Sequence, residues 1–272
     1  MNVDPLALEH VMADGWRAVE EDRLGGWMLR ASSGFTARGN SVLTAGSPGM
    51  PLPDAVAVVQ DWYAARELPA RFALVTDAAG APTDPLLWER LTTLGYATDQ
   101  PTLAMTASAS ELPALTEASP PVRADTRLTQ PWLEAFAAYR SIVPGVAEQI
   151  LTGSMSQLFL EVPAGPDESD QPAEPLGAIV RVALYPGWAG LHAMWVAPQR
   201  RRQGLATGLV AAVGQLCREH HIPDVYLLVQ RANSAAREAF GGMGFRDHHG
   251  QLYLQRPTPE LAGLSSAKPI SR

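Results

Sequence analysis

Residues Val196–Leu209 read Val-Ala-Pro-Gln-Arg-Arg-Arg-Gln-Gly-Leu-Ala-Thr-Gly-Leu, and this stretch decides how the chain is interpreted. An apolar strand ends at Pro198, a short basic turn follows, and a helix begins at Gly204. The first N–H groups of a helix have no partners within it, and the helix dipole adds positive potential there. Small residues at 204, 206 and 208 let an anion approach the backbone, and the arginines add charge-assisted hydrogen bonds. We therefore expect a phosphate-binding helix N-terminus rather than a basic turn without a ligand.

The stretch lies within an alternating pattern of strands and helices. Leu205, Leu209, Val213 and Leu216 recur at helical spacing and form one apolar stripe. The pattern predicts strands at 157–162, 176–183, 190–196, 225–229 and 251–255, and helices at 130–139, 146–152, 204–219 and 234–243. This part of the chain is therefore expected to form a mixed α/β unit.

The first part of the chain repeats the later portion of this order. We expect strands at 27–31, 41–44, 72–76 and 102–105, and helices at 54–66 and 85–94. Gly95-Tyr96 stands where Gly244-Phe245 stands in the second part. The repetition favours an internal duplication, although two unrelated α/β units can share such an order.

A linker rich in small residues and proline, residues 108–122, separates the two parts. We therefore predict domains at 1–115 and 116–257, followed by a flexible tail at 258–272 without periodicity. A second polar stretch, 163–175, is expected to form a hairpin or loop between two strands.

Composition excludes several classes of protein. The 272 residues are 46% hydrophobic and 18% charged, which is enough apolar material for a sizeable core. No apolar run approaches the ~18 residues of a membrane span, and the start of the chain lacks the basic flank and apolar stretch of a signal peptide, so we expect a cytoplasmic protein without membrane contact. The formal charge is −7, and residues 1–115 carry 14 acidic against 7 basic side chains, so nothing suggests a nucleic-acid partner.

Few residues are available for a metal site. The single cysteine, Cys217, falls on the apolar stripe and is expected in the core rather than as a nucleophile. His220 and His221 end a helix, and His248 and His249 are placed in a polar turn. We expect no metal.

Two motifs in the second part resemble the GNAT (general N-acetyltransferase) superfamily. Its acyl-CoA motif is matched by Val196, Pro198, Arg201, Gly204 and Ala206. Its second motif, an apolar strand followed by Asn-x-x-Ala and a helix ending in Gly-Phe, is matched by Val225–Val229, Asn233, Ala236 and Gly244-Phe245. The resemblance covers roughly residues 122–256, and more weakly the whole chain as two GNAT units in tandem, each a mixed, mostly antiparallel twisted sheet flanked by helices. Residues 45–51 stand where the first unit would carry the phosphate-binding turn, so the resemblance implies a degenerate N-terminal copy and a catalytic C-terminal copy.

The resemblance implies acetyl-CoA as co-substrate and assigns residues to it. The backbone of Met194, Trp195 and Val196 would pair with pantetheine like an added strand. Arg201 and the amides of Arg202, Gln203, Gly204, Leu205, Ala206 and Thr207 would hold the pyrophosphate. Asn233 would lie beside the pantetheine or cap the following helix, and Phe240 would lie along the same cofactor.

Transfer to an amine also needs a base and a group that receives the departing thiolate. His192 lies four residues before Val196, where several relatives carry a glutamate base, although a strand histidine can simply be satisfied by a neighbour. Phe240 replaces the tyrosine that protonates the thiolate in many relatives. Tyr226, Tyr253 or water could take its place, or the thiolate could leave without a dedicated acid.

The acceptor side carries no shared motif. Glu148 and Tyr139 lie where relatives place acceptor-binding helices and could contact the substrate, but we expect both at the surface. The first part contributes residues that we interpret as structural, with a second possibility that they wall the acceptor cleft: Trp27, Arg30, Asn40 and Trp62.

The leading interpretation is an acetyl-CoA-dependent N-acetyltransferase acting directly on a primary amine of a small molecule. The acidic first part favours a cationic acceptor by electrostatic steering. The alternatives are a protein lysine or N-terminal acetyltransferase and a non-catalytic acyl-CoA-binding regulatory module. A monomer and a homodimer both remain open.

Overall fold

The computed structural model describes residues 3–164 and 176–256. The predicted tail and most of the predicted 163–175 loop lie outside these residues. None of the helices within the described ranges has the length and apolar composition that a membrane span requires.

The first part of the chain supplies five strands and three α-helices. They follow in the order α1 (Pro5–Asp14), β1 (Glu20–Leu24), β2 (Trp27–Ala31), β3 (Val42–Leu43), α2 (Leu52–Ala64), β4 (Arg71–Thr76), α3 (Pro85–Thr93) and β5 (Ala97–Ser108), with a short 3-10 turn η1 (Arg38–Asn40) before β3.

The second part supplies the remaining elements. They are β6 (Arg123–Asp125), α4 (Gln130–Ala137), α5 (Val146–Thr152), β7 (Ser156–Pro163), β8 (Leu176–Tyr185), β9 (Trp188–Val196), α6 (Leu205–Glu219), β10 (Asp224–Gln230), α7 (Ser234–Gly242) and β11 (Arg246–Gln255), with the 3-10 turn η2 (Pro198–Arg200) before α6. The predicted mixed α/β class is confirmed.

All described strands join in one sheet, in the order β1-β2-β3-β4-β11-β5-β10-β9-β8-β7-β6. The last strand of each part lies in the other part's half of the sheet, because β11 pairs with β4 and β5 pairs with β10. The parallel pairs β3–β4 and β9–β10 flank this exchange at matching positions. The order is therefore nearly symmetric about the central β5–β11 pair, as a duplicated unit would produce. The predicted domain boundary at 115/116 stays a prediction.

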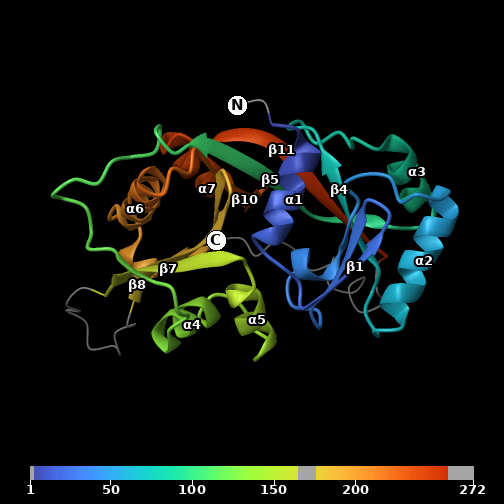
Figure 1. Cartoon of the computed structure of the whole chain (residues 1–272), viewed down its shortest axis with the longest axis horizontal. Helices are drawn as coiled ribbons and strands as arrows, with labels where there is room; N and C mark the ends of the chain where they lie inside the picture. The colour runs from blue at the N-terminus through green and yellow to red at the C-terminus, as the bar shows by residue number, and fades with distance from the viewer. Residues whose placement is uncertain (1–2, 165–175, 257–272) are drawn as a thin grey trace, which may run out of the picture.

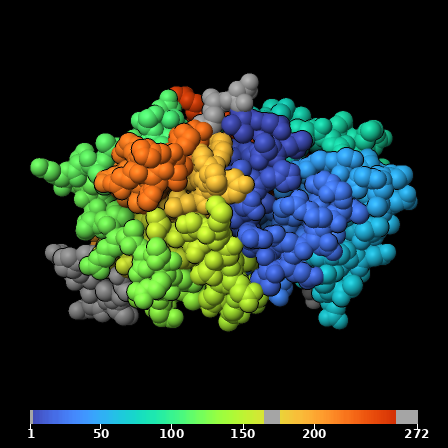
Figure 2. All heavy atoms as spheres, viewed as in Figure 1, coloured from blue at the N-terminus to red at the C-terminus, as the bar shows by residue number. Residues whose placement is uncertain are grey.

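Helices cover the sheet at both ends (Figure 1). α2 and α3 lie at one end with the apolar cluster around Val56, Val59 and Phe72, and α6 lies at the other with the cluster around Leu209 and Val213. α1 lies between the two halves, and Figure 2 shows the N-terminal residues packed directly against the second part. The hydrogen bonds from Ser154 Oγ to the carbonyl oxygens of Asp14 and Gly15, both 3.1 Å, belong to this contact.

Three short elements and one strand differ from the sequence prediction. α1, β1 and β6 were not predicted, because none combines sufficient length with clear apolar periodicity. β11 begins at Arg246, so the placement of His248 and His249 in a polar turn is wrong. These polar residues form a strand because β4 and β5 pair with β11 on its two edges.

Candidate functional site

The strands β9 and β10 diverge at their carboxyl ends. They pair in parallel from Trp188 and Asp224 only as far as Leu191 and Leu227. Beyond this point β10 continues along β5 to Gln230, and β9 continues along β8 to Val196. The β10-facing edge of residues 192–196 thus has no strand partner among the described residues, and it is available to an extended ligand.

A β-bulge bends β9 at this point. The register with β8 shifts between the pairs Ile179–Trp195 and Arg181–His192, which leaves Ala193 and Met194 opposite a single residue. Ala193 has φ 52°, a left-handed conformation that non-glycine residues rarely adopt. Both Ala193 and Met194, the residues of the bulge, line the opening.

A cleft of about 400 Å³ occupies the opening. The second part contributes its inner wall from β9, β10 and α7, and it adds Phe136 of α4 and Tyr139 from the turn after α4. The first part contributes Trp16, Thr36 and Arg38. Residues from both parts of the chain therefore meet at one cavity.

The predicted cofactor residues divide between the cleft and the segment that follows it along the chain, residues 195–207. Met194, Asn233 and Phe240 line the cleft. Asn233 also caps α7, because its Oδ1 accepts a hydrogen bond of 3.1 Å from the Ala236 N–H. The side chain of Trp195 packs with a separate apolar cluster and stacks on Tyr139 at 5.9 Å, so only its backbone is available to a ligand in the opening.

The N-terminus of α6 lies just beyond the carboxyl end of β9. Gly204 is its N-cap with φ 78°, and no side chain caps the first N–H groups. A Cβ built on Gly204 would meet nothing within 4 Å, so the space directly beside Gly204 is open. Gly208 serves a different purpose from the one predicted, since a Cβ there would lie 2.4 Å from Pro120 Cγ. Gly208 lets the linker pack on the helix rather than letting an anion approach.

The equivalent turn in the first part is filled by the chain itself. The Gly26 N–H donates to Ser47 O, and the Trp27 indole donates to Gly46 O at 2.9 Å. A Cβ on Gly25 would lie 2.5 Å from the backbone of Pro48. The β1–β2 hairpin thus packs directly on the backbone of residues 46–48.

His192 lies at the inner end of the cleft with both ring nitrogens engaged. Arg38 Nη1 lies 3.2 Å from Nδ1, and because arginine only donates, Nδ1 is the acceptor and the neutral ring carries its proton on Nε2. Nε2 lies 3.3 Å from the Tyr226 hydroxyl. Burial and the charges of Arg38 and Arg181 hold the pKa of His192 well below its usual range. The imidazole is therefore neutral at neutral pH.

This depressed pKa predicts a loss of stability in acid. As the pH falls below about 6.5, the unfolded chain binds a proton at His192 and the folded chain does not, so the free energy of unfolding decreases by up to about 1.4 kcal/mol per pH unit for this group. Urea unfolding of the wild type and His192→Gln at about pH 7 and about pH 5 measures the slope. We expect a smaller decrease in the variant, and equal slopes would contradict the assignment.

The two tyrosines proposed as acids lie in different places. Tyr226 is buried between Gly15 and Gly190, where a Cβ would lie 2.0 Å and 2.3 Å from its hydroxyl. It lines a second, smaller cavity and reaches the site only through His192. Tyr253 lines the cleft itself and donates to Gln251 Oε1 at 3.0 Å. Burial raises the pKa of both phenols, so both are protonated at neutral pH.

A buried polar network behind Tyr253 was not predicted. Glu9 of α1 contacts His249 Nε2 through Oε1 at 2.8 Å and accepts a hydrogen bond from Gln251 through Oε2. The Nδ1 atoms of His249 and His248 lie 2.7 Å apart. The network therefore connects the cleft-lining Tyr253 with α1 through alternate residues of one face of β11.

Asn40 holds the loop that carries Arg38. Its Oδ1 accepts hydrogen bonds from Ser32 and Gly34, and its Nδ2 donates to the carbonyl oxygens of Phe35 and Thr36. Asn40 is thus structural, and it shapes the cleft through the loop.

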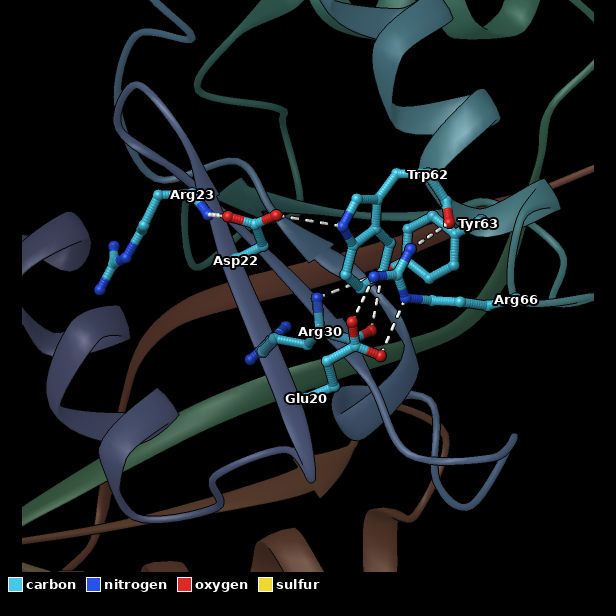
Figure 3. A network of polar contacts seen from close by, with 7 residues as sticks. All are labelled: Glu20, Asp22, Arg23, Arg30, Trp62, Tyr63 and Arg66. Atoms are coloured by element: carbon cyan, nitrogen blue, oxygen red, sulfur yellow. Dashed lines mark hydrogen bonds and ion pairs between the residues drawn. The ribbon is translucent and has the colours of Figure 1, made fainter.

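The other three residues interpreted as structural do not line the cleft. Arg30 is buried and bonded to Ser41, and Tyr63 donates to its carbonyl oxygen. Trp62 donates to Asp22 and lies beneath Arg66, which pairs with Glu20 (Figure 3).

The remaining candidate residues are Cys217, Tyr139 and Glu148. Cys217 is buried in the α6 core, where burial raises the pKa of its thiol to about 11, so the core interpretation is confirmed. Tyr139 lines the cleft and Glu148 does not. Within residues 3–164 and 176–256, no three acidic, cysteine or histidine side chains gather in a way that could hold a metal ion.

Comparisons with known proteins agree with this geometry. A family model described as Probable histone acetyltransferase Rv0428c C-terminal matches residues 6–254. The Uncharacterized N-acetyltransferase YobR of Bacillus subtilis (strain 168) is 24% identical over 248 residues, which cover 89% of this chain and 96% of YobR.

Two solved structures share the fold. A GCN5-related N-acetyltransferase from Kribbella flavida superposes with a TM-score of 0.64 at 15% identity, over 95% of this chain and 98% of that one. A tandem GNAT protein from the clavulanic acid biosynthesis pathway gives a TM-score of 0.56 at 12% identity, over 76% of this chain and 70% of that one. These likenesses extend over both parts of the chain.

Proposed function

The chain belongs to the acetyltransferase family described as Probable histone acetyltransferase Rv0428c C-terminal and is an acyltransferase of the GNAT type, and we propose that it transfers the acetyl group of acetyl-CoA directly to a primary amine of a small molecule. One observation carries the proposal: β9 and β10 diverge to open a cleft that is lined by β9 as far as Met194, and the chain then leads from the end of β9 to the uncapped N-terminus of α6 at Gly204. The pyrophosphate would bind the amides of residues 202–207, and pantetheine would lie along the open edge of β9.

The reaction needs one proton acceptor. The amine nitrogen forms a bond to the thioester carbonyl carbon, the C–S bond breaks, and sulfur leaves with the electron pair as a thiolate. The proton that nitrogen loses passes to Nδ1 of His192, the only ring nitrogen without a proton. Of Tyr226 and Tyr253, the two phenols considered as acids, Tyr253 is the one that lines the cleft and could face the sulfur.

Two neighbouring arginines affect the protonation of His192, the proposed base. Arg38 and Arg181 disfavour the protonated form of His192 and also disfavour an ammonium nearby, so an amine in the cleft loses its proton more readily. The Nε2 contact with Tyr226 holds the ring orientation.

We expect His192→Gln to lower kcat for acetyl transfer more than tenfold while the Kd for acetyl-CoA stays within about twofold. Glutamine keeps hydrogen-bonding groups near Arg38 and Tyr226 but cannot take the proton. Release of CoA in the presence of a panel of primary amines, with mass spectrometry of the acetylated product, measures the effect. Transfer at the wild-type rate would remove His192 from the role of base and leave the acetyltransferase proposal standing.

A protein lysine acetyltransferase is the second candidate, because the matching family carries the description of a probable histone acetyltransferase. A lysine-rich peptide would have to bring several cations to a cleft lined by Arg38 and Arg140. We therefore favour a small amine. Mass spectrometry of a lysine-rich peptide and of small amines incubated with enzyme and acetyl-CoA distinguishes the two, and faster modification of the peptide would reverse the preference.

A further inference from the structure

The charged residues that line the cleft all carry positive charge. Arg38 and Arg140 line it, and no aspartate or glutamate does so among the residues that the structure describes. The acidic excess of residues 1–115 therefore does not extend to the cleft, and the charge at the site is opposite to that of the first part as a whole.

Arg38 lies at the inner end of the cleft, where it contacts Trp16 and His192. Its guanidinium lies 5.4 Å from the centre of the Trp16 ring and 3.2 Å from His192 Nδ1, and it is only half buried. No carboxylate within the described ranges lies within ion-pair distance of it. Four of its five N–H donors are thus not engaged by described side chains and can bind an anion in a planar fork.

Arg181 adds a second positive charge near Trp16 and His192. It is fully buried and lies 5.8 Å from the centre of the Trp16 ring, and its hydrogen bonds to described residues all go to neutral oxygens, those of Gly15, Leu151 and Ser154. Burial lowers the pKa of Arg181 to about 10, which still leaves it charged at neutral pH. A buried cation without a carboxylate partner makes the inner end of the cleft strongly attractive to anions.

We propose that the acceptor amine carries an anionic group, a carboxylate or a phosphate, which Arg38 binds at the inner end of the cleft. The proposal rests on the proposed function and names the class of its acceptor. The pyrophosphate of acetyl-CoA does not need these arginines, because its own cradle lies at residues 201–207 outside the cleft.

Binding of the anion also prepares the base. Arg38 occupies the only proton-accepting atom of His192 in the free protein. When the acceptor's anion draws the guanidinium away, Nδ1 becomes available and its positive neighbour is neutralised. Arg181 and the Tyr226 hydroxyl, the other groups that face His192, remain in place. The base is thereby released only when a substrate with the right charge is present.

Binding of matched reaction products tests the subsite without turnover. Calorimetry with N-acetylglycine, N-acetylglycinamide and N-acetyl-2-aminoethyl phosphate compares a carboxylate, a neutral amide and a phosphate, on the full chain with and without CoA. We expect at least one anion to bind at least tenfold more tightly than the neutral amide, and the better anion identifies the acceptor's group. Arg38→Gln should remove this difference, whereas Arg23→Gln on the exposed strand β1 should keep it.

Kinetics supply the second readout. Glycine should be acetylated with a higher kcat/KM than glycinamide at equal concentrations of unprotonated amine, and Arg38→Gln should raise the KM for glycine at an unchanged Kd for acetyl-CoA. Loss of the cation should also move the acid limb of the pH profile to higher pH. Tighter binding of the neutral amide, no binding of either anion, or wild-type binding by Arg38→Gln would overturn the proposal. Anion binding without any acetyl transfer would instead contradict the proposed function.

Discussion

Glu9→Ala is expected to lower the free energy of unfolding by about 2 to 5 kcal/mol, a drop of roughly 10 °C in Tm. The substitution leaves His249 and Gln251 buried without the carboxyl group that both contact. It also opens a cavity where α1 packs on the sheet, because Glu9 is itself 1% exposed.

Chemical denaturation followed by circular dichroism measures this effect. Glu9→Gln is the conservative partner, since its amide can still bond to both neighbours, and it should lose much less than the alanine variant. Glu89→Ala, an exposed acid on α3, is the matched control and should stay within about 0.5 kcal/mol of the wild type. Equal stability of Glu9→Ala and the wild type would show that α1 is not anchored through this network.

The contacts of Glu9 with His249 and Gln251 could not be predicted from the sequence. Glu9 and His249 lie 240 residues apart, and nothing local marks either as buried. His248 and His249 follow Arg246 and Asp247, a polar run that resembles a turn until pairing with β4 and β5 is known. Long-range strand exchange therefore decides the structure of this segment, and a local pattern does not encode it.

The proposed cofactor side of the site follows from local sequence, whereas the proposed acceptor side depends on long-range packing. The local structure of the proposed cofactor side, a strand end followed by an uncapped helix N-terminus, was predictable because consecutive residues, 196–207, form it. The acceptor side combines Trp16, Arg38 and Tyr139 from three separate segments. The positive charge of the cleft is opposite to the net negative charge of residues 1–115. Composition alone therefore predicts a cationic acceptor, whereas the cleft favours an anionic one.

Arg201→Glu/Gly204→Glu is expected to abolish acetyl-CoA binding. We expect the wild type to bind with micromolar Kd, about −8 kcal/mol. The space directly beside Gly204 is open, so a glutamate there can reach the uncapped N–H groups of α6 and repel the phosphates. Gly204 also adopts φ 78°, which any other residue tolerates less well, so a neutral control is needed.

Arg201→Gln/Gly204→Asn supplies that control, because asparagine tolerates the left-handed conformation and adds no negative charge. The neutral variant should keep measurable binding by calorimetry, weakened mainly by the lost arginine charge, whereas the glutamate variant should show none. Thermal unfolding of both confirms that they fold. Equal loss in the two variants would mean that backbone conformation rather than charge controls the site, and wild-type affinity in the glutamate variant would place the pyrophosphate elsewhere. A difference between them requires that the anion lies close to residues 201 and 204 at the N-terminus of α6, because the two variants differ mainly in the charge that they place there.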